Sequence, residues 1–136
     1  MTEITGQILD ALVQHYGKSK YYDFIPDIFI SDEDSILSGE FRPDWEMIVL
    51  YRNALLYGPE ELATVINHEY IHYLQSPTWL TRYGNTYDYY NNPYEVEAYT
   101  REEEWRNLPK LKSMLTSKEN SWAPAQNLNL KTLSLS

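Results

Sequence analysis

Three residues, His68, Glu69 and His72, have the types and the spacing of a metal-dependent hydrolytic site. Two histidines four positions apart on a helix lie on one face, so both imidazoles can bind a single metal ion. A glutamate directly after the first histidine can reach a water molecule on that ion. Such a site needs a third protein ligand, and it needs elements that hold all three ligands together.

The two histidines are predicted to lie on a long, mostly buried helix over residues 59–75. Proline at its first position and acidic residues in its first turn are typical of a helix start, and Ser76-Pro77 ends the pattern. At 100° per residue, His68, Glu69 and His72 fall in one polar sector of an otherwise apolar helix. Buried polar groups need partners, and a metal ion would provide them.

The third ligand is expected downstream of the motif. His15 is the only other histidine, and it is expected to be a solvated residue near the end of a separate helix. The remaining candidates are carboxylates, and they are Asp88, Glu95, Glu97, Glu102, Glu103 and Glu104.

A second helix, from Asn92-Pro93 to about residues 105–107, carries most of these carboxylates. Glu95 falls in its apolar sector, which should face the core, and Glu97 projects to nearly the opposite side. We therefore favour Glu95 over Glu97 as the third ligand. The alternative is that Glu95 only completes a capping box with the preceding asparagine.

The remaining pattern predicts an α+β fold. A first helix is expected over residues 3–16, packed on a sheet, and a short buried strand over residues 28–30. Residues 45–51 form the clearest strand, with the continuous apolar centre of a strand that is covered on both faces. A shorter helix is predicted over residues 110–116.

The length of 136 residues indicates one domain, which we place at residues 1–116. Residues 117–136 are expected to form a C-terminal tail. Its leucines nearly alternate with polar residues, so the tail is either mobile or an added edge strand.

Composition excludes several classes of function. The formal net charge of −9 argues against nucleic-acid binding, because no basic patch could collect phosphates. The chain has no cysteine, so disulfides and cysteine–zinc sites are impossible. It begins without a signal-peptide pattern and contains no apolar run long enough for a membrane span. We expect a cytoplasmic protein with no membrane partner.

The motif His68-Glu69-x-x-His72, followed on a second helix by Glu95, resembles the gluzincin metallopeptidases, a thermolysin-like clan. The single-domain minigluzincins are closest in size, and the resemblance covers roughly residues 27–106. It implies a compact zincin-like domain. In such a domain, a small twisted sheet packs on an N-terminal helix, a buried HExxH helix and a following helix with the ligand glutamate.

The resemblance also implies one zinc ion per chain, with His68, His72 and Glu95 as its ligands, and hydrolysis of a peptide bond. Glu69 would be the general base that takes a proton from water and passes it to the leaving amine. The substrate would be a peptide or protein, cleaved in endopeptidase fashion. A strand at residues 45–51 that lay at a sheet edge could pair with it.

This chain departs from the clan at Tyr99, where the clan often has an aspartate that steadies a histidine ligand. Glu102, on the same face, is a candidate to take over that contact. Tyr83, Tyr87 and Tyr99 are candidates for the donor that stabilises an oxyanion.

Two other hypotheses compete with that of a general peptidase. In the first, the chain is a zincin-fold regulatory or interaction protein with a dedicated partner and little or no general peptidase activity. Its small size and the missing aspartate fit that view. In the second, the motif is accidental and the helix is simply part of the core.

Overall fold

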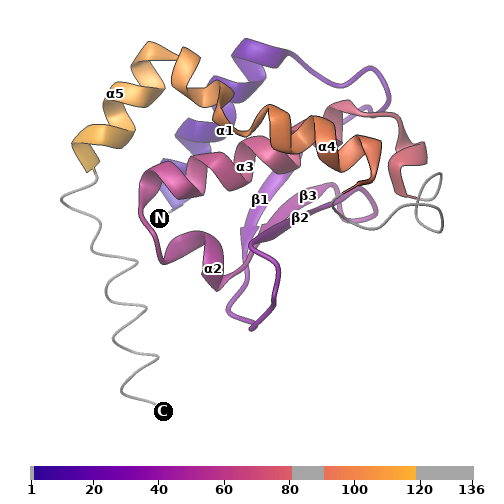
Figure 1. The fold of residues 1–136 in the computed structure, drawn as a ribbon, viewed down its shortest axis with the longest axis horizontal. Helices are drawn as coiled ribbons and strands as arrows, with labels where there is room; N and C mark the ends of the chain where they lie inside the picture. Colours follow the sequence, from indigo (N-terminus) through magenta and orange to yellow (C-terminus); the bar gives the residue numbers. More distant parts are fainter. Residues whose placement is uncertain (1, 81–90, 119–136) are drawn as a thin grey trace.

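The computed structural model describes residues 2–80 and 91–118 of the chain. Over these residues the fold is α+β, with five α-helices and a small three-stranded mixed sheet (Figure 1). The elements are α1 (Thr2–Tyr16), β1 (Asp27–Ile30), β2 (Gly39–Arg42), β3 (Met47–Leu50), α2 (Arg52–Leu55), α3 (Pro59–Leu74), the 3-10 helix η1 (Pro77–Leu80), α4 (Pro93–Thr100), the 3-10 helix η2 (Glu102–Asn107) and α5 (Pro109–Lys118).

Helix α3 is the central element of the fold. In Figure 1 it crosses the middle of the domain, with the strands below it and α4 above. Leu62, Ala63, Ile66, Tyr70 and Tyr73 are fully buried along it, so nearly every face of the helix is covered. Burial on this scale is what its apolar sequence predicts. The predicted bounds of 59–75 agree with the observed helix to within one residue.

The sheet has the strand order β1-β3-β2, with β1 parallel and β2 antiparallel to β3. The possibility that the strand at residues 45–51 lies at an edge is therefore wrong, because β3 is the central strand. Its apolar centre reflects this position, with Ile48 and Leu50 fully buried. The edge strand beside α3 is β2, which the sequence pattern did not reveal.

The close approach of β2 to α3 depends on a glycine. A Cβ atom on Gly39 would lie 3.0 Å from Cγ1 of Val65 on α3 and 3.1 Å from the backbone oxygen of Val49 on β3. A larger residue at this position would crowd both Val65 and the central strand, so one of these neighbours would have to shift.

The N-terminal helix occupies a different place from the one expected. The element that packs on β2 and β3 is α3, and α1 packs mainly on α3 and α5. The buried hydrophobic residues of α1, Ile4, Ile8 and Leu12, follow one another at intervals of four, which makes a narrow stripe. Such a stripe suits packing against another helix rather than across a sheet.

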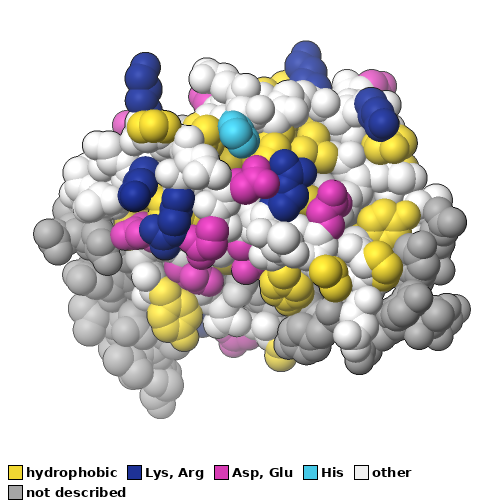
Figure 2. Space-filling view, turned by 45° about the horizontal axis from the view of Figure 1, so that its top comes forward, with side chains coloured by type: hydrophobic (Ala, Val, Ile, Leu, Met, Phe, Trp, Pro, Cys, Tyr) yellow, Lys and Arg dark blue, Asp and Glu magenta, His cyan; other side chains and the backbone are white. Residues whose placement is uncertain are grey.

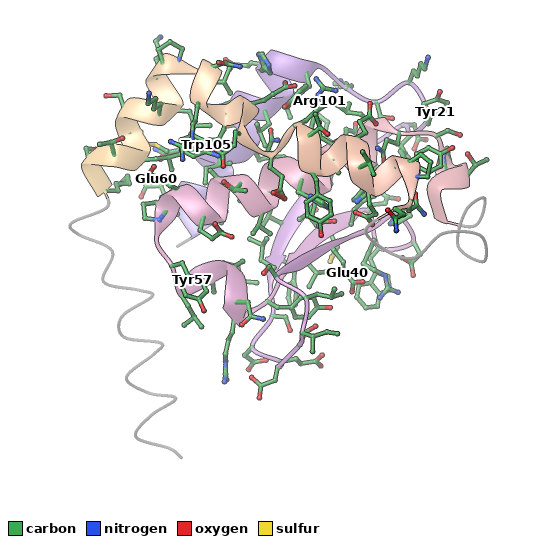
Figure 3. All side chains as sticks on the ribbon, in the orientation of Figure 1. Tyr21, Glu40, Tyr57, Glu60, Arg101 and Trp105 are labelled. Atoms are coloured by element: carbon green, nitrogen blue, oxygen red, sulfur yellow. The ribbon has the colours of Figure 1, made fainter. Side chains whose placement is uncertain are left out.

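The glutamate-bearing helix is shorter than predicted, because it breaks at Arg101. This residue has φ −99° and ψ 7°, and a separate 3-10 helix, η2, follows it. The side chain of Asn67, fully buried on α3, donates a hydrogen bond to the backbone oxygen of Arg101. Trp105 is fully buried, and its Nε1–H donates to Oγ1 of Thr64 at 2.9 Å (Figure 3). These contacts with α3 redirect the chain, and no local sequence pattern encodes them.

The turn between β2 and β3 contains a strained residue. Glu46 has φ +56°, the left-handed region that costs a non-glycine residue about 1–2 kcal/mol. Glycine relieves this strain but gains about 0.5–1 kcal/mol of conformational freedom in the unfolded chain. We expect Glu46→Gly to raise the free energy of unfolding by about 0.5–1 kcal/mol in denaturant titration. Glu33→Gly, at a residue outside that region, should lower it, and a loss of stability in both variants would contradict the prediction.

On the surface seen in Figure 2, several acidic side chains gather near the middle of the face. Basic side chains adjoin this acidic group, and hydrophobic side chains lie around it. Among the described helices, none combines the length and the apolar character that crossing a membrane requires.

Candidate metal centre

The structure brings His68, His72 and Glu95 together in the interior. Nε2 of His68 lies 3.0 Å from Oε1 of Glu95, and Nε2 of His72 lies 2.9 Å from the same oxygen. The three residues are 5%, 2% and 8% exposed. The two histidines come from successive turns of α3, and Glu95 comes from the first turn of α4. Asn92 caps this turn by accepting a hydrogen bond from the N–H of Tyr94.

The outer ring nitrogens of both histidines face other acceptors. Nδ1 of His68 lies 3.1 Å from Oε2 of Glu102, and Nδ1 of His72 lies 2.7 Å from Oε1 of Gln75. A neutral imidazole that donates from Nδ1 presents a lone pair at Nε2. Two imidazole lone pairs and a carboxylate oxygen therefore meet at one point, which is favourable only if a proton or a metal cation lies between them.

The pKa values of this group follow from the same geometry. Burial lowers the pKa of His68, but hydrogen bonds to Glu102 and Glu95 raise it to about 10. Burial raises the pKa of Glu95, but hydrogen bonds from His68 and His72 lower it to about 2. In the protein alone the carboxylate is thus ionised and His68 carries a proton, which a metal ion has to displace.

Glu69 lies beside this group but does not belong to it. The residue is 7% exposed, and its carboxyl group lies near the backbone of Phe41 on β2, which slightly lowers its pKa. Burial raises the pKa of Glu69, and the imidazoles of His72 and His68 offset this only in part. A carboxylate with a raised pKa is a better proton acceptor than a solvated one.

A cleft of about 440 Å³ opens along β2 and reaches the metal centre. Residues 39–44 and Leu37 line it, together with Glu69, His72 and Glu95. A water molecule or a small segment of a ligand could therefore contact the general base candidate and two of the three metal-ligand candidates at once.

The backbone of β2 also faces this cleft. Ser38 accepts a hydrogen bond from the N–H of Tyr51, so residues 38, 40 and 42 direct their backbone groups toward β3. Gly39 and Phe41 must then direct theirs away from β3, and the effect of the Phe41 backbone on the pKa of Glu69 agrees with this alternation. Pro43 is next on the outward side, where a missing N–H breaks no bond within the sheet.

Comparison of the chain with protein-family models, curated proteins and solved structures gave no significant match. The assignment of chemistry to this site therefore depends on its own geometry.

The other residues singled out from the sequence lie in different places. The ring of Tyr99 packs edge-on against His68, with ring centroids 4.9 Å apart. Glu97 lies away from the histidines and accepts a hydrogen bond from Nε2 of Gln75 at 2.6 Å. His15 lies 3.5 Å from Glu104, outside the metal centre. Glu103 pairs with Arg106. Tyr83, Tyr87, Asp88 and the tail from residue 119 onward lie outside the described residues.

Sequence reasoning missed two features of the site. One is Gln75, which contacts His72 from just beyond the end of α3. Its spacing of three residues after the second histidine was a usable signal, because side chains three apart meet on a helix. The other is the edge strand β2, whose four residues are too few to show a clear alternation of apolar and polar residues.

Proposed function

We propose that this chain is a zinc-dependent peptidase of the gluzincin type, with a zincin-like fold. The observation that carries the proposal is the convergence of His68, His72 and Glu95 on one buried point. Two imidazoles and one carboxylate are the donors of catalytic zinc sites, which leave the fourth position for water or substrate. Glu69, beside this point and facing the cleft, fits the role that the motif gives it.

Zinc at such a site would supply a Lewis acid that polarises a peptide carbonyl and lowers the pKa of water. The carboxylate of Glu69 would accept the proton that water loses on attack, and would then deliver it to the departing amide nitrogen. The burial of Glu69 between α3 and the cleft along β2 would restrict the orientation of this carboxylate through both transfers.

The contacts at the outer nitrogens would support the ligands. Glu102, in contact with His68, would take the place of the aspartate that the clan often has four residues after the ligand glutamate. The break at Arg101 favours this, because η2 begins at Glu102, directly after the break. Tyr99 would then cover the ring of His68 rather than orient it.

The edge of β2 would bind the substrate backbone. Its outward groups are the N–H and carbonyl of Gly39 and the carbonyl of Phe41, all along the cleft that contains Glu69. An extended peptide paired with them would lie against the metal centre, with binding that depends mainly on backbone hydrogen bonds. In this proposal the strand that pairs with the substrate is β2. The sequence had suggested the strand at residues 45–51.

The test is a metal analysis of the purified protein, followed by digestion of a peptide library. We expect about one zinc ion per chain and peptide hydrolysis that a chelator removes and added zinc restores. Zinc binding without cleavage of any library peptide would favour the alternative of a zincin-fold protein with a dedicated partner. A chain that binds no zinc even after zinc is added would contradict both proposals.

A further inference from the structure

Gln75 is a buried side chain with hydrogen bonds at both ends of its amide. It follows the last residue of α3, is 7% exposed, and contacts His72 on one side and α4 on the other. We infer that Gln75 is a positioning residue. It orients the zinc ligand His72 and anchors α4, the helix that carries the ligand Glu95. This inference rests on the proposed function, because it concerns the same metal centre.

The orientation of the amide follows from its partners. Its nitrogen lies 3.0 Å from the backbone oxygen of Tyr94 and 2.6 Å from Oε1 of Glu97, and both of these atoms are acceptors. The amide oxygen must therefore face His72, at 2.7 Å from Nδ1. Because this oxygen only accepts, Nδ1 must donate, and Nε2 keeps its lone pair for the metal.

The same amide joins two segments that a long connection separates. Tyr94 and Glu97 lie on either side of Glu95 in the sequence, so both anchors of Gln75 belong to the turn that carries the third ligand. This side chain therefore helps to fix the spacing between α3 and α4 at the metal centre. This also gives Glu97, the weaker candidate for a ligand, a defined role as the acceptor that holds Gln75.

Gln75→Met tests the orientation of His72. Methionine has a similar length but can form none of the three hydrogen bonds. We expect the zinc dissociation constant to rise about 10- to 100-fold, the usual cost of losing a partner of a metal-bound histidine. Competition with a chromophoric chelator measures it, on protein shown by circular dichroism to be folded without zinc. Gln7→Met, the same change on an exposed position of α1, is the control and should bind zinc as the wild type does.

A pair of exchanged side chains tests the link to α4. Gln75→Glu keeps an acceptor for His72 but places a second carboxylate against Glu97 and removes the donor to Tyr94. We expect it to weaken zinc binding. We expect the double variant Gln75→Glu/Glu97→Gln to bind zinc about tenfold more tightly than Gln75→Glu alone. The amide introduced at position 97 can donate a hydrogen bond to the new carboxylate at position 75.

The outcomes separate the two proposals. Wild-type zinc affinity in Gln75→Met, or no recovery in the double variant, contradicts the positioning role and leaves the zinc site intact. A lower melting temperature without zinc, with unchanged zinc affinity of the folded protein, would give Gln75 a merely structural role and would also contradict the inference. Absence of zinc binding in the wild type contradicts the proposed function itself, and the positioning role with it.

Discussion

Glu69→Gln will retain zinc and lose peptide hydrolysis. Glutamine has nearly the same shape as glutamate, and its amide oxygen is still a hydrogen-bond acceptor at the same place beside β2. It cannot take a proton from water at neutral pH, so both proton transfers lose their carrier. General acid–base catalysis typically contributes about 10²- to 10⁴-fold, and we expect kcat to fall by at least about 100-fold.

The measurement pairs zinc content with the steady-state rate on one cleaved peptide. Glu61→Gln is a matched control, because it makes the same change on α3 two turns before Glu69. That variant should keep both the metal and the rate. Loss of zinc in Glu69→Gln would show that Glu69 contributes to zinc binding. An undiminished rate of hydrolysis would show that Glu69 is not the general base.

The position of Glu69 explains why such a change should be tolerated by the fold. The carboxylate lies at the boundary between α3 and the edge strand, where burial already raises its pKa. A neutral amide is easier to bury than an ionised carboxylate, so the variant should not be less stable than the wild type for electrostatic reasons.

The central helix could be predicted from the sequence because its signals are local. Pro59 marks its start, and the apolar residues cover most of its circumference. The choice of Glu95 over Glu97 also came from a local property, namely the sector of the helix on which each residue lies. Their observed positions agree with that choice, since Glu95 contacts both histidines and Glu97 contacts Gln75.

The features that could not be predicted are set by contacts between distant segments. The break at Arg101 depends on Asn67, 34 positions earlier, which holds the backbone oxygen of Arg101. Glu102 was expected to contact His68 from one continuous helix, and it makes that contact from η2, after the break. The close approach of β2 to α3 is likewise a contact between distant segments, because a Cβ atom on Gly39 would crowd the side chain of Val65.

Glu95→Gln will abolish most of the stability that zinc gives to the protein. A ligand present at about 100 times its dissociation constant raises the free energy of unfolding by about 2.7 kcal/mol. Glutamine offers a neutral oxygen in place of the carboxylate that lies within 3.0 Å of both imidazoles. Much weaker zinc binding follows, so the melting temperature of Glu95→Gln should barely respond to zinc or to a chelator.

The same change at Glu97 shows which of the two glutamates is the zinc ligand. Glu97→Gln should keep most of the response to zinc, because its amide oxygen can replace the carboxylate as the acceptor for Gln75. Glu103→Gln, at an exposed residue that pairs with Arg106, controls for the loss of one surface charge. Scanning calorimetry of the four proteins, with zinc and with chelator, gives the result. If zinc still raised the melting temperature of Glu95→Gln but not that of Glu97→Gln, Glu97 would be the ligand in place of Glu95. That result would contradict the proposed metal centre.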